Sequence, residues 1–590
     1  MEKWVEIRKS ADFMKMAADY GISPIVARIL RNRDLVTPSE INSYLSPGES
    51  PLNDPMMLKG MDRVIFVLNE KIKDNKKIRI IGDYDVDGIC ATFILYKGLS
   101  FFKAKVDYCI PHRIEDGYGI NAKLIKDAYD SGADTIITCD NGISAIEQTE
   151  YAKSLGLTML ITDHHEVMFE EKDGVKHYII PDADAVVDPK LPGCEYPFWG
   201  ICGAYVAYQT ISALAGLMKM DEDASFISLK EELTEFASLA TVCDVMELRG
   251  ENRALVYRGS RLMADSKNLG MRSLISVTGM EGRLLTPYHM GFVIGPCLNA
   301  SGRLDTSLRA LELFTEKDSD AALKKAEDLK ALNEERKQMT IDETEKAFAM
   351  VDEMEKPDKV LVIYLPDCHE SLAGIIAGRV RERYFRPAFV VTRTENGLKG
   401  SGRSIEAYDM FESLLKVKDN LTKFGGHKLA AGISLNEDRL ESFREELNAN
   451  CTLSEDDFYD VVRIDMELPL EYATLDLARE LYKLEPFGNG NEKPVFAIRG
   501  VSIINGTRIG KNKNVGKYKV RDKSGRIYEM VYFGNPDLLE IFVESVYGKE
   551  TALSLHQGVK TDIVLDILYQ VEVNTFRGTD SVQLQIKSFR

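Results

Sequence analysis

Carboxylate and imidazole side chains recur at the ends of apolar segments in this sequence. An Asp-x-Asp-x-Asp-Gly motif at residues 83–88 follows the apolar run 78–81, and Asp163, His164 and His165 close a second run. Asp140 ends a third run and Asp244 lies in a fourth. Oxygen and imidazole ligands together suit a divalent ion such as Mn²⁺ or Mg²⁺. The pattern therefore predicts metal-dependent phosphoryl-transfer chemistry.

Alternating strand-length and helix-length segments between residues 76 and 163 would bring these side chains together. Such alternation predicts a parallel sheet with helices on both faces, and sheets of this kind bind ligands beyond the carboxyl ends of their strands. Two ions need a bridging carboxylate with further ligands on each side, and together they activate a shared water for attack on phosphorus. His165 could then reach a phosphate oxygen, while Asp163 orients the imidazoles. The candidate ligands are Asp83, Asp85, Asp140, His164 and Asp244.

Other interpretations exist for the single motifs. A calcium loop is excluded because its twelfth position is Ile94, where a bidentate Glu is needed, and because a strand precedes it. A solvated acidic turn at residues 83–88 and an ordinary turn at residues 140–142 remain alternatives when each motif is taken alone. Four acid or His groups ending separate apolar runs favour the metal site.

The composition is that of a soluble protein with several domains. The chain has 590 residues, which predicts roughly three or four domains, and a formal net charge of −18. Its nine cysteines form no C-x-x-C pair, which indicates reduced thiols and argues against zinc. The N-terminus lacks the apolar core of a signal peptide. The apolar run 204–218 contains polar residues and is too short to cross a bilayer. We therefore expect a cytoplasmic protein without membrane association.

A basic segment near the C-terminus contrasts with the acidic whole. Eight basic residues and one acid, Asp522, lie between Arg508 and Arg526. Residues 510–518 resemble a P-loop but have one spacer too many and a Tyr where Ser or Thr must hold Mg²⁺, which argues against nucleotide-triphosphate hydrolysis. A basic hairpin with an aromatic residue suits single-stranded nucleic acid, and a solvated lysine hairpin is the alternative. The expected contacts here are Lys511, Lys513, Lys517 and Tyr518.

Several motifs carry a family resemblance. Residues 83–88, 140–144 and 163–165, with Asp244, resemble motifs I to IV of the DHH phosphoesterase superfamily. Residues 113–119, 250–253 and 296–303 are similar to the RecJ family of 5′→3′ exonucleases specific for single-stranded DNA. Residues 425–432 resemble the substrate-binding motif of the associated DHHA1 domain, and residues 484–488 resemble the entry to an OB domain. The resemblance extends over residues 20–590.

The resemblance implies roles for individual positions. The five candidate ligands would bind two Mn²⁺ or Mg²⁺ ions, Asp140 would bridge them, and Asp87 would be a ligand or a supporting acid. This chain departs from the family at Asp188, where Asn is usual, at residues 202–205, where a Ser-Gly-Ala-Gly-like run is common, and at residues 368–371, where Trp-His-x-Gly is usual. The last departure affects recognition of the 5′ end. The expected substrate contacts in the two lobes are Arg113, Asn299, Arg303, Arg403, Gly425, Gly426 and His427.

The expected fold is α/β, with two α/β lobes joined by a long helix and followed by a β-barrel OB-fold. The expected domains are an N-terminal helical segment (1–65), the DHH domain (66–315), a connecting helix (316–356), the DHHA1 domain (357–452) and the OB domain (453–590). The resemblance implies a monomeric exonuclease that acts in DNA repair and recombination, releases 5′-mononucleotides, and works with a helicase and a single-strand-binding protein. A DHH phosphoesterase for very short or cyclic oligonucleotides and a catalytically inactive scaffold are the alternatives; the complete ligand set argues against the scaffold.

Overall fold

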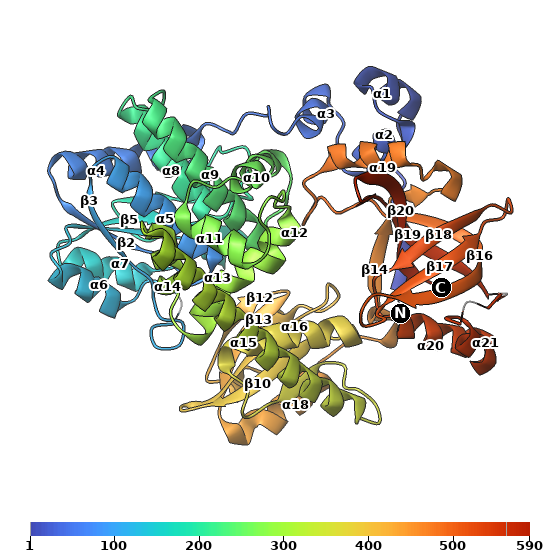
Figure 1. The fold of residues 1–590 in the computed structure, drawn as a ribbon. Coiled ribbons are helices and arrows are strands. Elements are labelled where there is room, and N and C mark those ends of the chain that lie inside the picture. Colours follow the sequence, from blue (N-terminus) through green and yellow to red (C-terminus); the bar gives the residue numbers. More distant parts are fainter. Residues whose placement is uncertain (1, 118, 558, 562) are drawn as a thin grey trace. The chain divides into compact units, whose positions relative to one another are not determined.

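The computed structural model describes residues 2–117, 119–557, 559–561 and 563–590. Tyr118, which belongs to the motif at residues 113–119, lies outside these ranges. The chain forms two compact units, of which the first contains residues 51–247 and 251–460 and the second contains residues 2–50, 248–250 and 461–590. Figure 1 labels the helices and strands of both units.

A parallel five-stranded sheet organises the first lobe of the first unit. Its strand order is β3-β2-β4-β5-β8, and every neighbouring pair is parallel. Because β2, β4 and β5 are adjacent and parallel, their carboxyl ends meet at one edge of the sheet. The strands are β2 (Lys77–Ile81), β3 (Lys105–Cys109), β4 (Thr135–Cys139), β5 (Thr158–Thr162) and β8 (Ala185–Val187).

Helices cover both faces of this sheet (Figure 1). α6 (Ala122–Asp130) and α7 (Ile146–Ser154) share one apolar cluster with strand residues such as Ile136 and Met159. α5 (Val86–Phe101) contacts α8 (Gly203–Leu217), α9 (Ala224–Cys243) and α14 (Leu308–Thr315), and α8 contacts α4 (Met61–Lys73). Neighbours on all sides explain why α5 is apolar around most of its circumference.

A single long helix leads from this lobe to the second one. α15 (Ser319–Asp352) has 34 residues, which corresponds to a length of about 51 Å. It contacts α11 (Leu269–Val277) and α13 (Gly295–Leu304) in the first lobe and α16 (Ala373–Tyr384) in the second. Asp318 caps its first turn by accepting a hydrogen bond from the Ala321 N–H.

The second lobe is built on a mixed sheet with the order β12-β13-β11-β10-β9. β9 and β10 are parallel and the other pairs are antiparallel. The glycine-rich motif at residues 425–432 forms the paired strands β12 and β13 at one side of this sheet. The strands are β9 (Leu361–Tyr364), β10 (Ala388–Thr394), β11 (Gly397–Arg403), β12 (Lys423–His427) and β13 (Ala430–Leu435).

The second unit contains a closed β-barrel. Its sheet runs β15-β16-β17-β18-β20-β19, and pairing of β16 with β19 closes it. α20 (Pro536–Tyr547) and α21 (Lys549–Ser554) are inserted between β18 and β19. The strands are β15 (Met466–Glu467), β16 (Phe496–Ile509), β17 (Val515–Arg521), β18 (Ile527–Tyr532), β19 (Ile563–Phe576) and β20 (Thr579–Phe589).

The N-terminal residues belong to the barrel unit. β1 (Glu2–Glu6) pairs with β14 (Asp460–Ile464), and α1 (Phe13–Tyr20), α2 (Pro24–Asn32) and α3 (Pro38–Leu45) follow. Buried side chains of α2 and α3 share one core with barrel residues such as Phe496. This long-range packing was not anticipated from the sequence, which grouped residues 1–65 as a separate helical segment.

The predicted fold class is confirmed: two α/β lobes, a long connecting helix and a C-terminal barrel are all present. No helix within the described ranges is long and apolar enough to cross a membrane.

Candidate metal centre and substrate cleft

The first acidic motif lies in the turn between β2 and α5, which two glycines keep tight. A Cβ on Gly82 would lie 1.9 Å from Thr92 Oγ1, and a Cβ on Gly88 would lie 2.4 Å from the Asp83 carbonyl oxygen. Helix α5 can therefore begin directly against the strand end only with glycine at both positions. Asp83 is 1 % exposed as a result.

Asp85 caps helix α5. Its Oδ1 accepts hydrogen bonds from the N–H groups of Asp87 (2.9 Å) and Gly88 (3.2 Å). This bonding fixes one carboxylate oxygen toward the helix and, with it, the orientation of the group.

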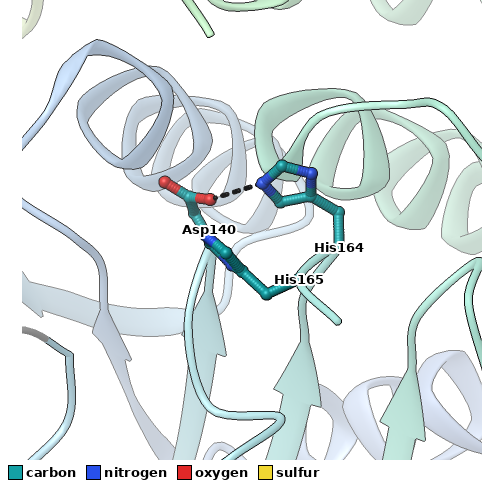
Figure 2. A group of neighbouring side chains, drawn as sticks. All are labelled: Asp140, His164 and His165. Carbon is teal, nitrogen blue, oxygen red and sulfur yellow. Dashed lines mark ion pairs between the residues drawn. The ribbon is translucent and has the colours of Figure 1, made fainter. Parts of the chain in front are cut away.

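The ends of β4 and β5 supply the next side chains. Asp140 follows β4 in the left-handed backbone region (φ 60°), a conformation that is uncommon for non-glycine residues. His164 follows β5, and its Nε2 lies 3.1 Å from Asp140 Oδ1. Figure 2 shows Asp140 and His164 turned toward each other beyond the strand ends.

Asp163 holds the two histidines in place through hydrogen bonds. Its Oδ1 accepts the N–H groups of His164 (2.7 Å) and His165 (3.3 Å) and lies 2.7 Å from His165 Nδ1. Its Oδ2 accepts the Ile143 N–H at 2.9 Å. Burial opposes the charge on Asp163, but the hydrogen bond from His165, the charges of the two histidines and the Ile143 N–H together lower the pKa of Asp163.

Asp87 and Asp244 complete the carboxylate group. The two oxygens of Asp87 accept the N–H groups of Gly203 (2.7 Å) and Ala204 (2.8 Å) at the start of α8. Asp244 follows the last residue of α9. Its Oδ2 lies 3.7 Å from His164 Nε2, and Asp87 Oδ2 lies 3.6 Å from the same nitrogen. Since both its oxygens are occupied by backbone donors, Asp87 suits a supporting position.

Three groups of these side chains have the geometry to hold a metal ion: Asp83 with Asp85 and Asp140, Asp140 with His164 and His165, and Asp87 with His164 and Asp244. Asp140 and His164 each belong to two groups. Within the described chain, Asp83 Oδ1 and both ring nitrogens of His164 are buried without a well-formed hydrogen bond, although His164 Nε2 lies within 3.1–3.7 Å of three carboxylate oxygens. Buried polar atoms without partners are rare in folded proteins, and atoms of these types are metal ligands. The residues therefore fit a divalent cation.

The electrostatics also fit a cation. Burial and the neighbouring Asp85 raise the pKa of Asp83 well above its usual range, and burial with Asp87 does the same for Asp140. Burial and Asp87 raise the pKa of Asp244 to about 8, whereas burial lowers the pKa of His164. Burial acts against the charge on His165, but its hydrogen bond to Asp163 raises the pKa of His165 to about 9. Packed carboxylates repel one another, and a divalent ion would offset that repulsion.

A cleft of about 500 Å³ lies between the two lobes of the first unit. Arg113 and Arg303 line it from the first lobe, and Arg403 and Gly425 line it from the second. Arg303 Nη1 donates a hydrogen bond to the Ser371 carbonyl oxygen at 2.6 Å, and the Arg113 guanidinium stacks on Tyr84, 4.6 Å from the ring centroid. Burial and the neighbouring Arg113 lower the pKa of Arg303 to about 9. Three converging guanidinium groups suit a polyanion.

The cleft includes some predicted substrate contacts and omits others. Asn299, Gly426 and His427 are absent from its lining residues. His427 lies at the exposed end of β12, where Nδ1 accepts the Leu429 N–H at 3.3 Å. Sequence reasoning missed several lining residues. No motif marks Lys399 or Lys423, whereas Tyr84 lies within the motif at residues 83–88, and Glu370 and Ser371 lie within residues 368–371, a segment already compared with the family. The missed lining residues include Tyr84, Glu370, Ser371, Lys399 and Lys423.

In the barrel unit, one predicted DNA contact is corrected. Tyr518 is 0 % exposed, and its hydroxyl lies 2.7 Å from Nε2 of His556, which follows helix α21. A ring enclosed in this way offers no face for a base, so the prediction that Tyr518 stacks on substrate is wrong. Lys511 and Lys513 lie at the exposed tip of the β16–β17 hairpin, while Lys517 pairs with Glu529 at 2.9 Å. No helix follows residues 510–518, as a P-loop would require.

The departures from the family pattern lie close to these groups. Asp188 is fully buried, and its Oδ1 accepts the Lys190 N–H at 2.7 Å. Cys202 precedes the α8 turn that binds Asp87, and its thiol is buried. His369 Nδ1 lies 2.7 Å from Ser371 Oγ, beside the cleft.

Comparison with known proteins gives matches over three segments. The DHH family N-terminal domain matches residues 77–241, the DHHA1 domain matches residues 358–452, and the RecJ OB domain matches residues 464–588. The single-stranded-DNA-specific exonuclease RecJ of Bacillus subtilis is 32 % identical over 99 % of this chain and 70 % of its own length.

Two solved structures are also similar. RecJ of Thermus thermophilus in complex with Mn²⁺ aligns over 100 % of this chain and 79 % of its own, with a TM-score of 0.81 and 24 % identity. A second structure, exonuclease RecJ bound to manganese, aligns over 68 % of this chain and 96 % of its own, with a TM-score of 0.57 and 31 % identity.

Proposed function

The chain belongs to the RecJ family, and we propose that it is a metal-dependent exodeoxyribonuclease that digests single-stranded DNA in the 5′→3′ direction. The observation that carries this proposal is the shared membership of Asp140 and His164 in the candidate metal groups. Metal ions bound there would be held by ligands from these groups, with Asp140 and His164 at the positions where the groups meet. The relative with 31 % identity whose structure contains manganese supports Mn²⁺, and the oxygen-rich ligand set is compatible with Mg²⁺.

The ligands of the two ions would be Asp83, Asp85, Asp140, His164 and Asp244. Such a pair of ions supplies an activated water and stabilises the charge that develops on a phosphodiester during in-line displacement. Side chains of the protein position the other groups of the site. Asp163 holds the His165 ring through Nδ1, and this contact would orient the imidazole for a phosphate oxygen of the substrate. Asp87 fixes the start of α8 against the centre.

Substrate binding would use the cleft between the lobes. Arg113, Arg303 and Arg403 would bind phosphates of the strand, and the backbone of Gly425 borders the same space. Lys511 and Lys513 on the barrel hairpin would neutralise further phosphates. We keep Asn299, Gly426, His427 and Lys517 as candidate contacts from the family resemblance.

We also propose that the enzyme is a cytoplasmic monomer that releases 5′-mononucleotides during DNA repair and recombination. A helicase and a single-strand-binding protein would supply its substrate, since a single-strand nuclease needs strands that have been separated. Sedimentation of the purified chain tests the monomeric state, and digestion of a duplex with and without an added helicase tests the coupling.

The central experiment measures digestion of single strands labelled at the 5′ or 3′ end, with Mn²⁺ or Mg²⁺ and with duplex and RNA controls. Asp140→Ala and His164→Ala should abolish digestion while circular dichroism stays unchanged, because each substitution removes a ligand common to two groups. The matched control is the exposed carboxylate variant Asp127→Ala, which should digest like the wild type. Substantial metal-dependent digestion by either ligand variant would contradict the site. Cleavage restricted to dinucleotides would instead favour a phosphoesterase for short oligonucleotides.

A further inference from the structure

Two exposed aromatic rings lie on a segment that contacts the end of helix α9. Tyr288 and Phe292 are 64 % and 70 % exposed, and their rings stack with centroids 5.2 Å apart and planes inclined by 27°. They belong to α12 (Pro287–His289) and the π-helical turn η2 (Met290–Ile294). π-helical turns are rare and occur frequently at functional sites. A solvent-exposed pair of stacked rings is suited to binding a ligand that has an aromatic face.

The segment is fixed against the end of helix α9. The Cys243 thiol donates a hydrogen bond to the Met290 carbonyl oxygen at 3.6 Å, and a Cβ on Gly291 would lie 3.5 Å from the Val242 side chain. The residue after Cys243 is the candidate ligand Asp244. The aromatic pair therefore belongs to the Asp244 side of the metal centre.

Helix α13 connects this segment to the cleft between the lobes. At its first residue, a Cβ on Gly295 would lie 2.4 Å from Cys243 Sγ, and near its last turn a Cβ on Gly302 would lie 2.6 Å from the Tyr84 carbonyl oxygen. Its ten residues span about 15 Å. The helix thus runs beside the metal centre from the Asp244 side to the side of Tyr84, with the rings at one end and the cleft at the other. Figure 1 shows α12 and α13 following one another in the first lobe.

We propose that Tyr288 and Phe292 form a base-stacking platform for the single strand, on the side of the metal centre opposite the cleft. This inference rests on the proposed exonuclease function. A strand with one end in the arginine-lined cleft must continue past the cleavage site, and the end of α13 away from the cleft presents these rings to it. Aromatic faces bind bases without regard to sequence, as a nuclease of this kind requires. Arg283, exposed in the loop that precedes α12, would supply a cation for a neighbouring phosphate.

The test compares the double variant Tyr288→Ala/Phe292→Ala with the double variant Phe66→Ala/Tyr129→Ala. The control removes the same two ring types from α4 and α6, where they are 51 % and 45 % exposed. For a 5′-phosphorylated single strand of twenty nucleotides, the platform variant should have a KM raised by about tenfold and an unchanged kcat, since stacking of one base accounts for that much affinity. Hydrolysis of bis(p-nitrophenyl) phosphate, which is too small to reach the platform, should be unchanged. Trp at both positions should restore the wild-type KM.

Equilibrium binding separates this proposal from the proposed function. Anisotropy of the labelled strand in EDTA measures affinity without digestion. The fluorescence of 2-aminopurine placed along the strand should be quenched by stacking on the rings in the wild type and in the control variant, but not in the platform variant. A wild-type protein that binds the strand through the rings without digesting it would refute the exonuclease and support the platform. Digestion by the wild type with equal KM and affinity in both double variants would overturn the platform. Concentration-dependent association of the wild type that the platform variant loses, with DNA affinity intact, would also overturn it and assign the rings to a protein contact.

Discussion

Replacing Asp188 by Asn should stabilise the first unit at high pH and lose this advantage at low pH. Asp188 is fully buried next to the candidate metal centre, at a position where the family usually has Asn. Burial, with the nearby carboxylate of Asp163, raises the pKa of Asp188 from 3.8 to about 7. The folded protein therefore binds this proton more tightly than the unfolded chain, and the wild type loses stability as the pH rises from about 4 to about 7. An amide carries no charge and avoids this loss.

The structure sets the size of the effect. A difference of about three pKa units corresponds to ~4 kcal/mol of stability lost by the wild type above pH 7, and more than half of this loss accrues between pH 5 and pH 8.5. The amide oxygen of Asn can still accept the Lys190 N–H, which lies 2.7 Å from Oδ1. Oδ2 has no hydrogen-bond partner within the described residues, so the amide NH₂ in its place is a buried donor that costs about 1–3 kcal/mol at every pH. The variant should be more stable than the wild type by about 1–3 kcal/mol at pH 8.5, and near neutral or slightly less stable at pH 5.

The assay is urea denaturation of the metal-free protein in EDTA at both pH values. Pulsed hydrogen exchange read on peptides from residues 158–190 follows this lobe separately from the barrel unit. The exposed Asp127→Asn variant makes the same change of charge and serves as the control. The constant cost of the amide cancels when the two pH values are compared, so the pH-dependent difference is the decisive quantity. If Asp188→Asn shifts the unfolding free energy equally at pH 5 and pH 8.5, the fold does not hold this carboxyl group protonated, and the reasoning fails.

Further predictions concern the imidazole support and the barrel. Asp163→Asn should reduce activity about 10–100-fold and destabilise the lobe by about 2 kcal/mol. The single oxygen of the amide cannot accept hydrogen bonds from both the Ile143 N–H and the His165 ring. Steady-state kinetics and urea denaturation measure these losses. Tyr518→Phe should leave single-strand affinity unchanged in anisotropy titrations and cost about 1 kcal/mol of stability, because only the buried hydrogen bond to His556 is lost. Lys511→Ala combined with Lys513→Ala should reduce the slope of log K against log salt by about 1.4, and an unchanged slope would show that neither lysine contacts phosphate.

The meeting of the candidate ligands could be predicted where they follow strands. Asp83, Asp140 and His164 come after β2, β4 and β5, and these strands are neighbours in a parallel sheet. Parallel order places their carboxyl ends at one edge, so strand–helix alternation in the sequence was sufficient for this inference. Asp244 differs because it follows a helix. Its approach to His164 depends on how α9 packs against α5, which no local pattern in the sequence specifies.

The burial of Tyr518 could have been predicted from strand alternation. Alternate residues of a strand point to opposite faces, so Tyr518 shares a face with Val520, whereas Lys517, Lys519 and Arg521 share the other. In β17 the first face is the barrel core. We grouped Tyr518 with the lysines as a DNA contact because they are adjacent in the chain, but in the strand they point to opposite faces. The basic face of the hairpin therefore remains a candidate for DNA binding, but Tyr518 does not belong to it.

The contact between Asp87 and the start of α8 explains which departures from the family pattern this site tolerates. Asp87 accepts hydrogen bonds from the backbone N–H groups of Gly203 and Ala204, and such donors do not depend on the side chains at positions 202 and 205. The buried Tyr205 has its own partner, because its hydroxyl donates to Glu251 Oε2 at 2.8 Å. Position 203 is different, since a Cβ there would lie 2.6 Å from the Asp140 Cβ and would displace a candidate bridging ligand. The metal centre therefore constrains the backbone of the α8 turn and the absence of a side chain at residue 203, while it leaves the flanking residues free to change.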